Sequence, residues 1–190
     1  PSGPYFKGGL SGVAIWVERE YHRAGPGGTG SAKAGGNYAA SLLPQIQAEA
    51  KGFSQVCFLD TYEGKYLEEL GGMNMFVVMA DGTIRTPELT GVILEGGTRS
   101  AILRMLRDQG VDVREEKIAL SEVVDGIRSG AVAEVFACGT AAVVTPITRL
   151  GGDDFDVEIE VGDKTREIHK RLTDIQWGRA EDPYGWTYRL

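Results

Sequence analysis

The sequence predicts one α+β domain, and three observations support this. Several short apolar runs along the 190 residues are typical of β-strands. Between them lie a few segments whose apolar residues recur at helical spacing. No internal repeat or linker is visible, and with 42% hydrophobic residues the chain can build one sizeable core.

The first segments are predicted to be a loop and then a strand. Pro1–Gly12 has the composition of a loop, and the alternation of Val13, Ile15 and Val17 predicts a strand over Val13–Glu20. Because a domain rarely begins on a loop that leads into a core strand, we expect this chain to have lost an N-terminal neighbour.

A helix is expected over Ala39–Ala50, because three apolar residues there stand at helical spacing: Leu42, Leu43 and Ile46. Gly52 follows as a stop. Pro44 lacks a backbone donor and clashes one turn back, so the helix proper is predicted to begin near Ser41.

The next region is predicted to be a β-meander. Gln55–Leu59 is typical of a buried strand, and Leu67–Met79 has two carboxylates, a Gly71-Gly72 break and then a second strand. Asp81-Gly82 is a hairpin turn signal that leads to a strand over Thr83–Thr86.

A second helix is predicted within Leu94–Gly110, with Ile102 on its apolar face. Gly96-Gly97-Thr98 precedes it. Free N–H groups and the helix dipole make such a glycine-rich approach suitable for phosphate, although simple capping by Thr98 is the more common explanation.

The remainder is predicted to alternate strands and helices. We expect a strand over Val111–Ile118, a helix over Leu120–Ser129, two strands within Glu134–Leu150 hinged at Gly139-Thr140, and a helix over Gly162–Trp177.

Composition excludes several classes of function. A net charge of −7 without a clustered basic face argues against nucleic acid as a partner. No apolar run reaches the length of a membrane span and no signal peptide opens the sequence, so we expect a cytoplasmic protein. Cys57 and Cys138 lie in apolar runs and are predicted to be buried thiols, and His22 and His169 form no metal-binding motif, so no metal is expected.

Lys33 is the strongest candidate for a chemical group. It lies in the stretch GGTGSAKAGGNY, Gly27–Tyr38, where glycine on both sides lets the backbone turn tightly and approach a ligand. For an arbitrary lysine between glycines, a flexible surface loop with a solvated side chain would be the more common interpretation.

Four separated motifs together resemble one family. In order, SAKAGGNYAASLL, EELGGMNMF, GGTR at Gly96–Arg99 and EVFACGTAAVVTPI are similar to the branched-chain amino acid aminotransferases of pyridoxal 5′-phosphate (PLP) fold type IV, and DIQWGRAEDPYGW near the C-terminus fits as well. The resemblance covers essentially the whole chain. It implies that residues 1–190 form the family's PLP-binding large domain, a β-rich pseudo-barrel with flanking helices.

The resemblance assigns the cofactor contacts. Lys33 would hold PLP through an imine and shuttle the substrate proton. Tyr38 would contact the cofactor's phenolate oxygen, and Glu69 would pair with its pyridine nitrogen. Without the motifs, Tyr38 would be interpreted as a core tyrosine and Glu69 as a solvated charge at a strand end.

The phosphate and substrate contacts follow from the same resemblance. Gly97 and Thr98 would bind the phosphate, and Thr140 would give it a second hydroxyl. Backbone N–H groups at Thr140-Ala141 would bind the substrate carboxylate, near Gly72. Here Glu95 and Gly97 replace the family's usual proline and β-branched residue, and a carboxylate beside phosphate is unfavourable unless it points away.

The implied reaction moves an amino group between leucine, isoleucine or valine and 2-oxoglutarate, giving branched 2-oxo acids by a ping-pong route, in a homodimer. The family's N-terminal small domain is missing from this sequence, which would weaken activity. Alternatives are a D-amino acid aminotransferase or aminodeoxychorismate lyase of the same fold, or a non-catalytic fragment.

Overall fold

The computed structural model describes residues 9–188. Its helical elements are η1 (Gly9–Ser11), α1 (Gly35–Ala50), α2 (Gly97–Asp108), α3 (Leu120–Ser129) and α4 (Asp163–Gln176). Its strands are β1 (Val13–Glu18), β2 (Gln55–Leu59), β3 (Leu67–Leu70), β4 (Asn74–Met79), β5 (Ile84–Pro87), β6 (Val113–Glu116), β7 (Val132–Gly139), β8 (Val143–Gly151) and β9 (Asp156–Glu158).

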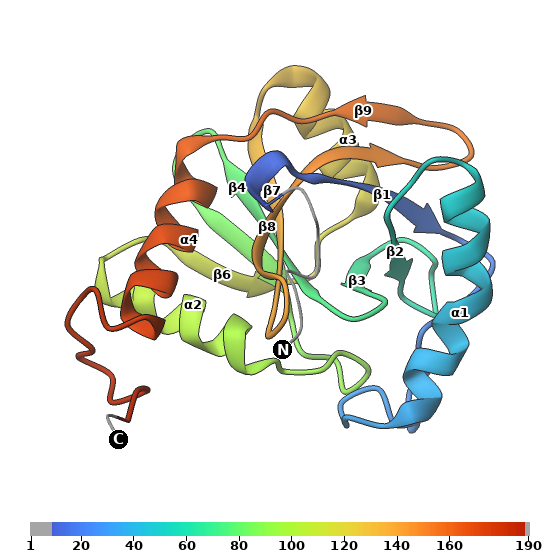
Figure 1. Ribbon diagram of the computed structural model, residues 1–190. Helices are drawn as coiled ribbons and strands as arrows, with labels where there is room; N and C mark the ends of the chain where they lie inside the picture. The colour runs from blue at the N-terminus through green and yellow to red at the C-terminus, as the bar shows by residue number, and fades with distance from the viewer. Residues whose placement is uncertain (1–8, 189–190) are drawn as a thin grey trace.

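The strands form one mixed sheet in the order β3-β2-β1-β8-β7-β4-β5-β6, with β9 paired to β8 (Figure 1). The sheet curls until its two ends approach each other. Tyr66, just before β3, forms a bridge with Ala119, just after β6, and the Leu67 N–H donates to the Ile118 carbonyl at 2.9 Å. The predicted α+β class and the barrel-like architecture with flanking helices are therefore confirmed.

Both faces of the sheet are buried along β1, β2 and β4, which explains why these strands are almost continuously apolar. Along β4, Met75 and Val77 face the cluster that packs against α3. Phe76 lies on the opposite face, beneath α2 and α4, and stacks on Phe136 with ring centroids 4.9 Å apart.

Helix α1 differs from the prediction in extent and orientation. It begins at Gly35, and Pro44 lies inside it on the buried side together with Ser41 and Ala48. The apolar residues that suggested the helix are all exposed: Leu42, Leu43 and Ile46. Packing against β2 decides which face is buried, and it outweighs the backbone hydrogen bond lost at Pro44.

The predicted β-meander is wrong, because β3 and β4 are not neighbours. Strand β3 pairs with β2, whereas β4 pairs with β5 and β7. The Gly71-Gly72 break carries the chain from one end of the curled sheet to its middle. The hairpin at Asp81-Gly82 is confirmed, as is the hairpin that turns at Gly139-Thr140.

Other element predictions are confirmed with small shifts. Helices α2, α3 and α4 lie where they were expected, and Cys57 and Cys138 are both buried. Strand β9 was not predicted. Of the loop predicted over Pro1–Gly12, the first eight residues lie outside the described residues.

Candidate active site

The lysine loop lies between β1 and α1. Lys33 is exposed, two residues before the helix begins, and its Nζ lies 5.5 Å from the centroid of the Tyr38 ring. Tyr38 is 37% exposed, so it is not a core tyrosine. The helix start places both side chains on the same side of the loop, facing one cavity.

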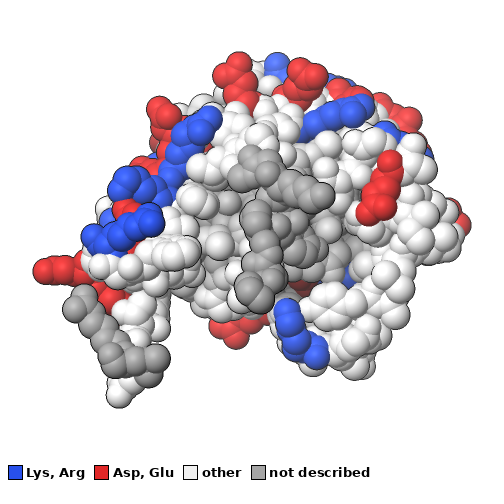
Figure 2. All heavy atoms as spheres, viewed as in Figure 1, with Lys and Arg blue, Asp and Glu red and all other residues white. Residues whose placement is uncertain are grey.

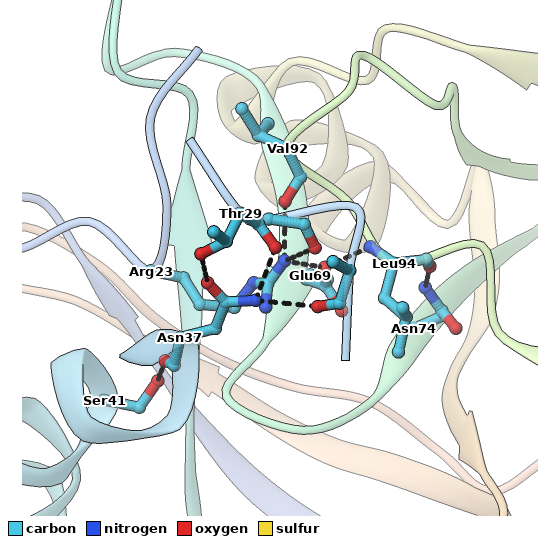
Figure 3. A network of polar contacts seen from close by, with 10 residues as sticks. Arg23, Thr29, Asn37, Ser41, Glu69, Asn74, Val92 and Leu94 are labelled. Atoms are coloured by element: carbon cyan, nitrogen blue, oxygen red, sulfur yellow. Dashed lines mark hydrogen bonds and ion pairs between the residues drawn. The ribbon is translucent and has the colours of Figure 1, made fainter. Parts of the chain in front are cut away.

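Asn37 fixes the shape of this loop. Its side-chain amide donates to the carbonyls of Thr29 and Ala32, at 2.8 and 2.9 Å, and its Oδ1 accepts the Thr29 hydroxyl at 2.7 Å (Figure 3). Because Asn37 is almost fully buried, these bonds are shielded from water. Asn37 therefore orders the backbone immediately before Lys33, a role that the sequence did not reveal.

Glu69 is the buried acid of the site. It lies on β3 with its side chain 4% exposed, and it is ion-paired with Arg23, the two charged groups being 2.5 Å apart. The Leu94 N–H donates to the same carboxylate at 2.7 Å (Figure 3). The interpretation of Glu69 as a solvated strand-end charge is therefore wrong.

Opposing influences set the acidity of Glu69. Burial raises the pKa of its carboxyl to about 7, while Arg23, the Leu94 N–H and Lys33 each act to lower it. Lys33 therefore lies near enough for its charge to act on this carboxyl, as does Arg99.

Five predicted residues share one cavity of about 280 Å³: Lys33, Tyr38, Gly72, Thr140 and Ala141. The β7–β8 turn supplies the last two. This turn holds Val143 at φ 57°, a conformation that is costly for a β-branched residue and is found mainly at functional sites. The five residues come from three segments that are far apart in the sequence.

Two other predicted residues line a second, adjoining cavity. Gly97 and Thr98 are in the first turn of α2, and Thr140 lies on the walls of both cavities. Among the described residues, no side chain caps this helix end, so capping by Thr98 is not what the structure has. The first N–H groups of α2 remain available to an anion.

Two predicted features lie apart from these cavities. Glu69 is not among the described residues that line either one. Glu95 is exposed, accepts a hydrogen bond from Ser100 at 3.3 Å and borders a different hollow.

Three buried polar residues were missed by sequence reasoning: Arg23, Asn37 and Asn74. Asn74 donates to the Leu94 carbonyl at 2.8 Å and so anchors the segment that leads into α2. Asn37 and Asn74 both stand inside the quoted motifs, GGNY and GGMN, which is the signal that could have identified them.

On the face shown in Figure 2, positive and negative side chains are interspersed. Along α4, Lys164 pairs with Glu167 and Lys170 with Asp174. Within residues 9–188, no helix is both long enough and apolar enough to span a bilayer.

The fold is that of a class IV aminotransferase. Residues 15–150 match the family model for amino-transferase class IV, and the chain belongs to that family.

Its relatives narrow the comparison to one group. Over its whole length the chain is 47% identical to a probable branched-chain-amino-acid aminotransferase of Streptomyces coelicolor and to a branched-chain-amino-acid aminotransferase of Mycobacterium tuberculosis, covering 53% of each. The chain thus spans about half the length of the curated relatives it matches.

Solved structures agree. A branched-chain amino acid aminotransferase of Escherichia coli superimposes with a TM-score of 0.83 at 32% identity, over 98% of this chain and 59% of that one. A branched-chain aminotransferase of the thermophilic archaeon Thermoproteus uzoniensis, solved with norvaline, gives 0.79 at 32% identity, over 95% of this chain and 56% of that one.

Proposed function

We propose that this chain is the PLP-binding large domain, residues 1–190, of a branched-chain amino acid aminotransferase. One observation carries the proposal. Lys33 and Tyr38, which belong to one stretch of sequence, line one cavity with Gly72 and the Thr140-Ala141 turn, which lie far from them in the sequence. The names of the relatives support the choice of substrate class.

The residues present fit PLP. Lys33 supplies a primary amine, the first turn of α2 offers uncapped N–H groups beside Thr98 and Thr140, and Glu69 is a buried acid. Another solved branched-chain amino acid aminotransferase, 29% identical to this chain, is a complex with pyridoxamine 5′-phosphate. When bound, PLP supplies an electron sink and a temporary carrier for the amino group.

Each side chain would then have one task. Lys33 would attach to the cofactor and, once displaced by substrate, move the proton at the substrate Cα. The Tyr38 hydroxyl would donate to the cofactor's ring oxygen. Gly97, Thr98 and Thr140 would hold the phosphate, and Glu69 would hold a proton between itself and the ring nitrogen.

The substrate would bind at the turn between β7 and β8. Backbone N–H groups at Thr140-Ala141 would bind its carboxylate, and Gly72 would leave room beside the Tyr38 ring, because a Cβ there would lie 3.9 Å from that ring. The substrates would be leucine, isoleucine or valine with 2-oxoglutarate, giving branched 2-oxo acids. We also propose a cytoplasmic homodimer, which light scattering and cell fractionation would test.

The decisive experiment is chemical labelling. Purified chain is incubated with PLP, reduced with borohydride, digested and sequenced by mass spectrometry, and the label is expected on Lys33. A coupled assay then compares leucine with D-alanine as amino donor. A label spread over surface lysines, or turnover only with D-alanine, would reject the assignment.

A further inference from the structure

Arg23 connects three segments of the proposed site. Its side chain is 5% exposed, and its Nη2 donates to the carbonyls of Gly30, at 2.8 Å, and Val92, at 2.5 Å. The same nitrogen forms the ion pair with Glu69. Gly30 precedes Lys33 in its loop, and Val92 precedes the phosphate turn, so one guanidinium joins both loops to β3 (Figure 3).

The close approach of the two loops depends on Gly30. A Cβ at this position would overlap the backbone of Val92, its carbonyl oxygen above all. Only glycine lets the two carbonyls come near enough for one nitrogen to bind both. The convergence on Arg23 is therefore built into the backbone.

The two oxygens of Glu69 are not equivalent. Oε1 receives both Arg23 and the Leu94 N–H, whereas Oε2 accepts no hydrogen bond from the described residues. Within the same residues, Thr165 Oγ1 is the one fully enclosed side-chain polar atom without a partner, so Oε2 is not fully enclosed. One oxygen is anchored and the other is available.

We propose that Arg23 is the positioning residue of this site: it anchors Oε1 of Glu69 and holds the Lys33 loop and the phosphate turn together, so that Oε2 is presented to the cofactor ring. The inference rests on the proposed function.

Electrostatics give Arg23 a second effect. The cations whose charge lowers the pKa of Glu69 are Arg23, Lys33 and Arg99, and Arg23 has the largest influence after burial itself. Without it, the pKa of the carboxyl would rise further, and more of the acid would be neutral at pH 7. A neutral acid would pair poorly with a protonated ring nitrogen.

The test compares Arg23→Gln and Arg23→Lys with Arg85→Gln. Arg85 is a matched control, since it is also mostly buried and ion-paired, with Glu116 and Glu122. Carbon-13 NMR of the cofactor-free protein follows the titration of the Glu69 carboxyl. Its signal is assigned as the one that is missing in Glu69→Gln. Absorbance titration measures PLP affinity, and circular dichroism verifies folding.

We expect Arg23→Gln to raise the Glu69 pKa and to weaken PLP binding at least about tenfold, as for loss of a charged hydrogen-bonding partner. Arg23→Lys should restore the Glu69 pKa but only part of the PLP affinity, because an ammonium group lacks the planar, forked donors of a guanidinium. Arg85→Gln should change neither. The proposal would be overturned if Arg23→Gln and Arg85→Gln had the same Glu69 pKa and PLP affinities within twofold of each other.

Failure of this inference can be told apart from failure of the proposed function. The NMR titration needs no cofactor, so it reports on Arg23 even if borohydride labels no lysine. If Arg23→Gln does not fold, Arg23→Lys decides: wild-type PLP affinity in that folded variant would contradict a positioning role, and a weakened affinity with a normal Glu69 titration would support it.

Discussion

The side chain of Asn74 occupies the space that a Cβ on Gly96 would need. The ideal Cβ position falls well inside contact distance of Asn74 Oδ1, and Gly96 has φ 73°, a left-handed conformation. Asn74 is itself held by its bond to the Leu94 carbonyl at 2.8 Å. The turn before α2 is therefore fixed by sterics and by a hydrogen bond.

Gly96→Ala is expected to destabilise the fold by about 1–3 kcal/mol, because alanine is strained at this φ and meets Asn74. It should also weaken phosphate binding by PLP. Gly97→Ala is the matched control, since a Cβ there meets nothing within 4 Å. Denaturant unfolding and PLP titration measure both effects; equal stability for the two variants would contradict this account.

Lys33→Ala should abolish transamination and borohydride labelling while leaving stability within about 0.5 kcal/mol, because the side chain is exposed. Lys117→Ala is the control. Lys117 is also exposed and lies over a tyrosine ring, 5.0 Å from the centroid of Tyr66, but outside the two site cavities. Retained labelling in Lys33→Ala would show that another amine binds the cofactor.

Glu134→Ala should lower the free energy of unfolding by about 1–2 kcal/mol. From β7, its carboxylate accepts the N–H groups of Lys164 and Thr165 at 3.0 and 2.8 Å and so satisfies the first turn of α4. The comparison is the exposed Glu167, which is paired with Lys164 within one helix. Glu167→Ala should lower the free energy of unfolding by at most a few tenths of a kcal/mol. Thermal melts give the ranking.

Glu68 makes stability depend on pH. The residue is 7% exposed, and its side chain has no hydrogen-bond or ion-pair partner among the described residues. Burial, with help from Asp60 and Glu69 and against Arg23, raises its pKa from 4.5 to about 7. The folded state therefore holds this proton more tightly than the unfolded state does, and that stabilisation is complete below pH 4.5 and is lost as pH rises to 7.

Glu68→Gln removes this titration. Relative to the natural sequence, the variant should be nearly unchanged at pH 4 and more stable at pH 8, by on the order of 1–3 kcal/mol. Urea unfolding of both proteins at the two pH values gives the difference. A difference that is the same at both pH values would mean that Glu68 does not titrate in this range.

The sequence predicted the elements better than their pairing. Local signals were sufficient for the turn at Asp81-Gly82 and for α2, α3 and α4, because turn chemistry and helical spacing act within a few residues. The separation of β3 from β4 was not predictable in this way. Which strands become neighbours depends on closure of the whole sheet.

The exposed face of α1 shows the same limit. Leu42, Leu43 and Ile46 have the spacing of a buried stripe, yet they face outward, and Ser41 and Pro44 face the sheet. Spacing shows that residues share a face but not what that face contacts.

By itself, the sequence determined the residue types and the motif order: a lysine between glycines, an acid before Gly71-Gly72, and a glycine turn ahead of a helix. The tertiary structure alone decided that Arg23 reaches Glu69, although the two are far apart in the sequence, and that Oε2 is the oxygen left free. The physical reason is that burying a charge requires a partner, and folding brought that partner from a distant loop rather than from the neighbouring sequence.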